Sequence, residues 1–162
     1  MSHENVEIVR RLQARYDGTD LVPGIRELVE RFGPNPEPEA LVAWWSEDPG
    51  WRYMHPEIDW DPGPGLLGRA RGIAELSQWW AEWVEAWESY VFRVSEYRDL
   101  GEWVLAVIDV RARGRGGIPV EMRVFELYRV RDGKVAVFRA YLSEHAALEA
   151  VGLSEHDAHA DS

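Results

Sequence analysis

The chain has 162 residues, of which 46% are hydrophobic, a formal net charge of −11 at pH 7 and no cysteine. The acidic balance argues against binding to a phosphate backbone, and the missing cysteines exclude disulfides, thiol catalysis and cysteine-ligated zinc. The length fits one domain, and nine tryptophans indicate a core or a pocket rich in aromatic rings. Because no signal-like core or membrane-length apolar run occurs, we expect a soluble cytoplasmic protein.

The first third of the chain predicts short helices separated by glycine and proline. Ser2 can cap a first helix that runs to about Tyr16. A short amphipathic segment follows and is stopped at Gly33-Pro34. Residues 35–38 (Asn-Pro-Glu-Pro) are expected to be a linker, because proline disrupts a helix interior. A further short helix then ends near Asp48.

The remainder predicts one strand, a long helix and four more strands. The expected elements are strand 57–61, loop 62–65, helix 72–89, strand 90–98, three strands within 103–142 with turns at 114–117 and 132–133, and helix 143–150. This order favours an α+β fold whose helices cover one face of a curved antiparallel sheet. The polar residues 154–162 are expected to form a disordered tail.

Four stretches carry a family resemblance: SHENVEIVRRL, HPEIDW, RGIAEL and RVRDGKVAVFRAYLSEHAALEAVGL. In these the chain resembles bacterial SnoaL-like proteins of the nuclear transport factor 2-like superfamily. The resemblance implies a single domain over residues 1–153, with an inserted helical segment at about 21–47. It implies a cone-shaped, cystatin-like α+β barrel in which helices pack on a strongly bent antiparallel sheet. It also implies a pocket between the concave sheet face and the helices, and dimers through the other face.

Two acids stand in otherwise apolar strands, and both are candidate catalytic residues. Asp109 shares a strand face with Arg111, so it is either half of an ion pair or a pocket acid oriented by the arginine. A four-residue loop over 114–117 pairs Asp109 with Met122 and places it on the same sheet face as Glu126. A bulge of one residue would reverse that placement.

Glu126 interrupts a strand face whose other members can all be core residues. A two-residue turn in the second hairpin pairs Glu126 with Arg139 and predicts a salt bridge. A three-residue turn with a glycine bulge pairs it with Phe138 instead. The second alternative puts Ala140 and Leu142 on the pocket face.

The resemblance extends to epoxide hydrolases of the same superfamily. It implies that Asp109 matches the first aspartate of their site. Ala140 stands where they carry a second aspartate, and Val107 where they carry an arginine. We therefore do not expect an epoxide hydrolase mechanism.

Bulky apolar side chains are the expected ligand-binding residues. They are Trp60, Trp79, Trp83, Met122, Val124, Phe138, Ala140 and Leu142. The alternative is that the aromatic ones only fill the core. Tyr90, Tyr128 and Tyr141 could each donate a hydrogen bond to a ligand oxygen. No spacing of histidines or carboxylates fits a metal site, so neither a metal nor another cofactor is expected.

Two functions stay open at this point. The first is cofactor-independent acid/base chemistry on a small apolar molecule, of isomerase or polyketide-cyclase type, with Asp109 or Glu126 as acid/base and Arg111 orienting it. The second is a non-catalytic ligand-binding or interaction module. In either case the apolar residues predicted for the outer sheet face favour a homodimer. These are Val104, Ala106, Ile108 and Phe125.

Overall fold

The computed structural model describes residues 2–33, 35–63 and 68–152. The predicted tail lies outside the described residues, as does the second half of the predicted loop 62–65. None of the described helices is long and apolar enough to cross a membrane.

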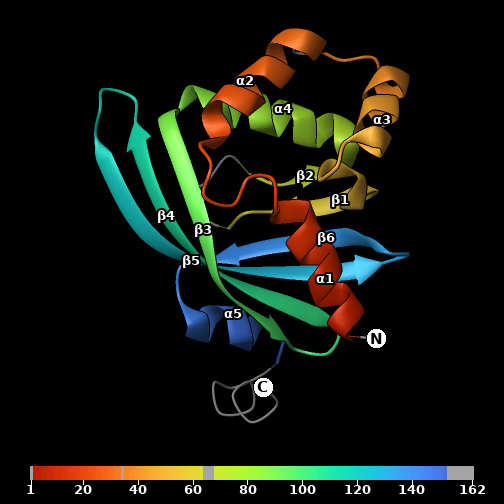
Figure 1. Ribbon diagram of the computed structural model, residues 1–162, viewed down its shortest axis with the longest axis vertical. Coiled ribbons are helices and arrows are strands. Elements are labelled where there is room, and N and C mark those ends of the chain that lie inside the picture. Colours follow the sequence, from red (N-terminus) through yellow and green to blue (C-terminus); the bar gives the residue numbers. More distant parts are fainter. Residues whose placement is uncertain (1, 34, 64–67, 153–162) are drawn as a thin grey trace.

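Within these residues the chain forms five α-helices, one 3₁₀ helix and six strands (Figure 1). The helices are α1 (Ser2–Gln13), α2 (Leu21–Phe32), α3 (Pro38–Glu47), η1 (Trp51–Tyr53), α4 (Gly72–Glu85) and α5 (Glu144–Ala150). The strands are β1 (Met54–Asp61), β2 (Ala70–Arg71), β3 (Trp87–Asp99), β4 (Trp103–Gly114), β5 (Pro119–Arg131) and β6 (Lys134–Tyr141). This is the predicted α+β class.

Several element boundaries differ from the prediction for local reasons. The expected linker ends one residue early, because Pro38 is the first residue of α3, where a missing N–H costs nothing. The long helix ends at Glu85 rather than at residue 89, and Trp87 already belongs to β3. β3 begins this early because it pairs with β4 as far as Gly114, opposite Trp87. The apolar periodicity of the helix does not predict such pairing between strands.

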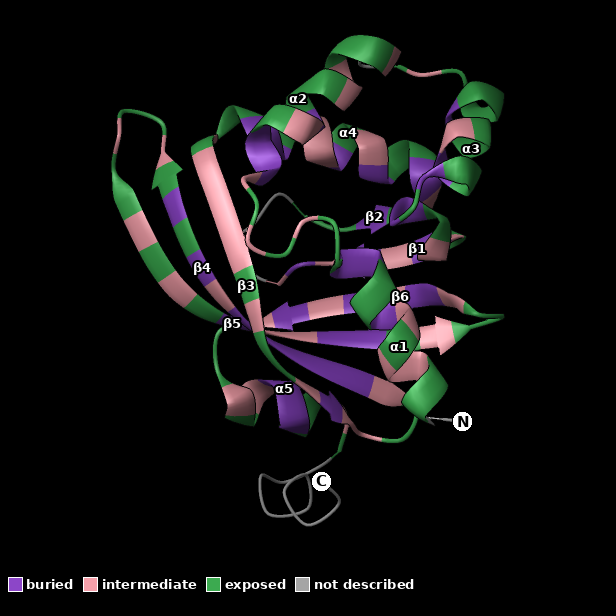
Figure 2. Cartoon of the chain, viewed as in Figure 1, coloured by how far each residue is buried: buried purple, intermediate pink, exposed green. Residues whose placement is uncertain are grey.

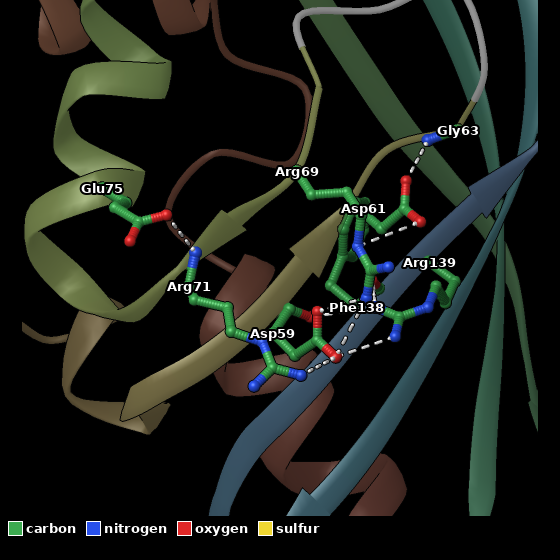
Figure 3. Close-up of polar contacts among 8 residues, drawn as sticks. All are labelled: Asp59, Asp61, Gly63, Arg69, Arg71, Glu75, Phe138 and Arg139. Atoms are coloured by element: carbon green, nitrogen blue, oxygen red, sulfur yellow. Dashed lines mark hydrogen bonds and ion pairs between the residues drawn. The ribbon is translucent and has the colours of Figure 1, made fainter.

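The six strands form one sheet in the order β2-β1-β6-β5-β4-β3. The sheet is mixed rather than antiparallel, because β1 runs parallel to β6. Arg139 on β6 joins the two strands by donating to the backbone oxygen of Asp59 at 3.1 Å and to its Oδ2 at 2.9 Å. Arg69 and Arg71 reach the same carboxylate from the β2 side (Figure 3).

Helices cover both faces of this sheet, not one as predicted. The inner face packs against α1, α2 and α4 in the main core, which α3 joins through its contacts with α4 and η1. This face includes Val104, Ala106 and Ile108. The short helix α5 packs on the opposite, outer face through Leu148, against Leu105 and Leu127. The expectation that Val104, Ala106 and Ile108 form an outer dimer surface is therefore wrong. Figure 2 shows buried residues along β1, β4 and β6, and exposed ones on the outward sides of the helices.

The first hairpin is one residue longer than expected. Gly114 N–H donates to the Ile118 oxygen at 2.8 Å, and Pro119 is the first residue of β5, opposite Arg113. Gly116 and Gly117 take positive φ angles, which glycine adopts without strain. Asp109 consequently stands opposite Arg123 instead of Met122, and this one-residue shift turns Asp109 to the face opposite Glu126.

The second hairpin combines the two alternatives left open by the sequence. Asp132 and Gly133 form a two-residue turn with positive φ at both positions, as a type I′ turn requires. A register shift between Arg129 and Val130 then adds one residue to β6. Glu126 therefore stands opposite Ala140, so both predicted partners, Arg139 and Phe138, are wrong.

Candidate functional site

A cavity of about 680 Å³ lies between the inner sheet face and the helices α1, α2 and α4. This volume is typical of pockets that enclose a small organic molecule. Aromatic rings from several elements line it, among them Tyr16, Trp51, Trp60, Trp79, Trp80 and Trp83. Trp60 on β1 stacks on Phe138 of β6 with ring centroids 4.0 Å apart, because the parallel pairing places the two residues side by side.

Every predicted ligand-binding residue lines this cavity. The set comprises Trp60, Trp79, Trp83, Met122, Val124, Phe138, Ala140 and Leu142. The rings therefore surround a space rather than only filling the core. Leu142 is 75% exposed, so it stands where the cavity meets solvent. Ligand binding by these side chains stays a prediction.

Glu126 is the one carboxylate among the described residues that line the cavity. Burial raises the pKa of its carboxyl from 4.5 to about 7, although hydrogen bonds from Tyr128 and Gln13 act in the opposite direction. Both of those bonds reach Oε1, from the Tyr128 hydroxyl at 2.6 Å and from Gln13 Nε2 at 3.2 Å. Oε2 accepts no hydrogen bond from the described residues, so one carboxyl oxygen is fixed and the other is available.

Gln13, at the end of α1, connects this acid to β3. The Tyr97 hydroxyl donates to Gln13 Oε1 at 2.6 Å, which directs the amide nitrogen of Gln13 toward Tyr128 and Glu126. Gln13 is 6% exposed. Sequence reasoning missed this residue, although its spacing from Val9 and Tyr16 (i, i+4, i+7) places it on the buried stripe of the first helix.

The three candidate tyrosines occupy different positions. The Tyr128 hydroxyl is already engaged by Glu126 and Gln13. Tyr141 lies at the end of β6, beside the exposed Leu142. Tyr90 lines the cavity, and its hydroxyl forms no hydrogen bond with another described residue. Burial, with a smaller effect from the charge of Glu126, raises the pKa of Tyr90 well above its usual value.

The predicted positions of Asp109 and Arg111 in the pocket are wrong. Asp109 pairs on the outer face with Arg123, whose Nε donates to Oδ1 at 2.8 Å. Arg111 is 84% exposed and lies 3.5 Å from a carboxylate oxygen of Glu121. Neither residue lines the cavity. The longer first hairpin causes both errors, because it places odd-numbered residues of β4 and even-numbered residues of β5 on opposite faces.

Within the described residues, no three histidine or carboxylate side chains come together in a way that could hold a metal ion.

A family model described as a SnoaL-like domain matches residues 25–138, which is well over half of the chain. The chain belongs to the SnoaL-like domain family. A search of curated proteins finds no match to it.

Solved structures share the fold of this SnoaL-like protein at low identity. An NTF2-like protein from Burkholderia xenovorans LB400 is 21% identical with a TM-score of 0.56, covering 88% of this chain and 92% of that one. A LEH-like epoxide hydrolase from M. tuberculosis is 13% identical, with a TM-score of 0.54 and coverages of 88% and 84%. TerC, co-crystallised with polyporic acid, is 19% identical with a TM-score of 0.54, and the match covers 72% of this chain and 97% of TerC. At these identities the likeness establishes an NTF2-like fold and nothing finer.

Proposed function

We propose that this SnoaL-like protein binds a small, largely apolar molecule in the cavity and exchanges a proton with it through Glu126. The observation that carries the proposal is the carboxyl group of Glu126, the one acid among the described residues of an aromatic cavity, with one oxygen anchored and the other available. A pKa of about 7 lets Glu126 take up and release a proton near neutral pH, as general acid/base catalysis requires.

Isomerase- or cyclase-type chemistry fits these residues best. In each of these reactions a proton leaves a carbon atom of the substrate, and here it would move to Oε2 of Glu126. From there it would return to another carbon atom in an isomerisation, or to the newly formed alkoxide oxygen in an aldol-type cyclisation. Tyr90 is the hydroxyl best placed to bind a substrate oxygen, because Tyr128 is engaged by Glu126 and Gln13. Epoxide hydrolysis is not proposed, since Asp109 stands on the outer face.

Binding without catalysis is the second candidate function. It is favoured by the scarcity of reactive side chains in the cavity, where Glu126 has no second carboxylate and no basic residue beside it among the described lining residues. The homodimer and the cytoplasmic location expected from the sequence also stay predictions.

The catalytic proposal is tested by measuring how fast the α-hydrogens of a flat apolar ketone exchange with deuterium from the solvent. We expect the wild type to accelerate exchange of the α-hydrogens of 2-tetralone with D₂O, followed by NMR, with a rate that rises with pH through about 7. Glu126→Gln should slow the catalysed exchange on the order of 10²-fold, because the amide cannot accept the proton. Asp109→Asn removes one outer acid and should leave the rate unchanged. Equal rates for the wild type and Glu126→Gln would exclude Glu126 as the acid/base.

A further inference from the structure

We propose, building on the function proposed above, that the ligand of the cavity is an organic ammonium ion whose positive head lies against the aromatic rings and beside Glu126. The proposal concerns the same site and adds the chemical class of the molecule that occupies it. Three properties of the lining support it: its aromatic surface, its scarcity of hydrogen-bond donors and its charge.

The aromatic surface comes from five elements that converge on one space. Trp51 on η1, Trp60 on β1 and Phe138 on β6 join Trp79, Trp80 and Trp83 on α4, with Tyr90 and Phe92 on β3. Aromatic faces carry partial negative charge and attract cations, tryptophan most strongly, and this attraction increases when the cation is desolvated. A trimethylammonium-like head is also apolar enough to lie on such rings.

Beyond the Tyr90 hydroxyl, the tryptophans of the lining offer few N–H donors to a ligand that carries acceptors. The indole N–H of Trp51 donates to the Tyr16 hydroxyl at 2.6 Å, and that of Trp79 to the Gly68 oxygen at 3.1 Å. The indole nitrogens of Trp60 and Trp80 have no partner in the described part of the chain, but they have essentially no accessible surface. Four of the five lining tryptophans therefore present rings rather than N–H groups to a bound molecule, which disfavours an anion or a molecule rich in carbonyls.

The charge of the lining has one sign. Glu126 is the sole carboxylate among the described lining residues, and no lysine, arginine or histidine stands with it. An unpaired carboxylate in an apolar site is costly, and a cationic ligand supplies the missing partner. The net charge of −11 on the whole chain also raises the concentration of cations near the surface.

An ammonium head beside Glu126 would also prepare this residue for the proposed chemistry. An adjacent positive charge favours the ionised carboxylate, which is the form that accepts a proton. The remaining titratable groups of the described lining are the tyrosine hydroxyls of Tyr16, Tyr90, Tyr128 and Tyr141, which come from α1, β3, β5 and β6. Glu126 is therefore the group expected to make ammonium binding depend on pH near neutrality.

A pair of isosteric probes tests this inference: phenyltrimethylammonium, and tert-butylbenzene, in which carbon replaces the charged nitrogen. Quenching of tryptophan fluorescence gives both dissociation constants at pH 8 and pH 5.5. At pH 8 we expect the wild type to bind the ammonium at least about tenfold more tightly than the neutral probe. The preference should shrink at pH 5.5, where Glu126 is protonated.

Glu126→Gln is the decisive variant, and Asp109→Asn is its matched control on the outer face. The first should lose the tenfold preference while keeping its affinity for tert-butylbenzene within about threefold, and the second should bind like the wild type. Retained binding of the neutral probe also shows that Glu126→Gln has folded. Equal affinity of the wild type for both probes at pH 8 would overturn the ammonium assignment and leave the proposed cavity site standing. Binding of neither probe would overturn both.

Discussion

The carboxyl group of Glu126 is held in position by three neighbours that come from different parts of the chain. Tyr128 stands on the same strand and Gln13 on the first helix, and Tyr97 on β3 orients Gln13. Together they hold one carboxyl oxygen in place. Burial nevertheless dominates, so the pKa of Glu126 is raised and its ionised form is disfavoured in the folded state.

This raised pKa predicts a pH-dependent stability at the level of one residue. Below about pH 4.5 Glu126 is protonated in the folded and unfolded states, and its contribution is fully present. As pH rises to about 7 and beyond, the unfolded state releases the proton more readily, so stability is lost. We expect this group to cost on the order of 2 kcal/mol between pH 5 and pH 8.

Urea denaturation at several pH values measures this effect. Glu126→Gln should flatten the loss of stability toward pH 8, whereas Asp109→Asn should retain the wild-type slope. Identical slopes for the wild type and Glu126→Gln would show that the carboxyl is not desolvated in the folded protein.

At the scale of elements, one aspartate connects the start of α2 to β3 by two hydrogen bonds. Oδ1 of Asp20 accepts from Val22 N–H, which caps the helix, and from Tyr90 N–H on β3, both at 3.0 Å. Leu21 and Ile25 of α2 line the cavity, and so does Tyr90 of β3. One carboxyl group therefore binds both the helix and the strand on this side of the site, and Arg26 of α2 adds a second link by donating to the Trp87 oxygen at 3.2 Å.

Asp20→Ala should accordingly destabilise the protein by about 2 kcal/mol, since it removes a helix cap and leaves the Tyr90 N–H without its acceptor. Thermal unfolding followed by circular dichroism measures the change. Asp20→Asn keeps the Oδ1 acceptor and should recover most of the loss. If asparagine were as damaging as alanine, the carboxylate charge rather than the hydrogen bonds would hold α2.

For the whole molecule, the two faces of the sheet differ in what covers them. The inner face carries the cavity under α1, α2 and α4, whereas α5 packs on the part of the outer face around Leu105 and Leu127. The rest of the outer face includes the ion pair of Asp109 with Arg123 and that of Arg111 with Glu121. Of the four residues expected to form a dimer surface, only Phe125 faces outward.

We still predict a homodimer through the outer face, with Phe125 and these ion pairs in place of the apolar surface first expected. Light scattering should give a mass of about twice the 18.7 kDa of one chain. Because charged pairs contribute, dissociation should increase when ionic strength rises from about 0.15 M to 1 M. A monomer at every concentration tested would contradict the prediction.

The sequence by itself determined the fold class, the family and the position of most elements, because apolar periodicity and turn residues act locally. It also identified Glu126 as an acid on an apolar face, and some of the aromatic residues that line the cavity, although not Tyr16, Trp51, Trp80 or Phe92. Sheet register was decided only by the tertiary structure. One extra residue before Pro119 moved Asp109 and Arg111 out of the site, and the register shift after Arg129 paired Glu126 with Ala140.

The physical reason is that side chains alternate along a strand with a period of two, so a shift of one residue reverses the face of every residue beyond it. The strand residues alone do not reveal such a shift. The hydrogen bond between Gln13 and Tyr97 could not be predicted from the sequence either. The two residues lie 84 positions apart along the chain, and only the packing of α1 on the sheet brings them together. Apolar patterns thus located the cavity, and long-range packing decided that Glu126, rather than Asp109, is the acid among its described lining residues.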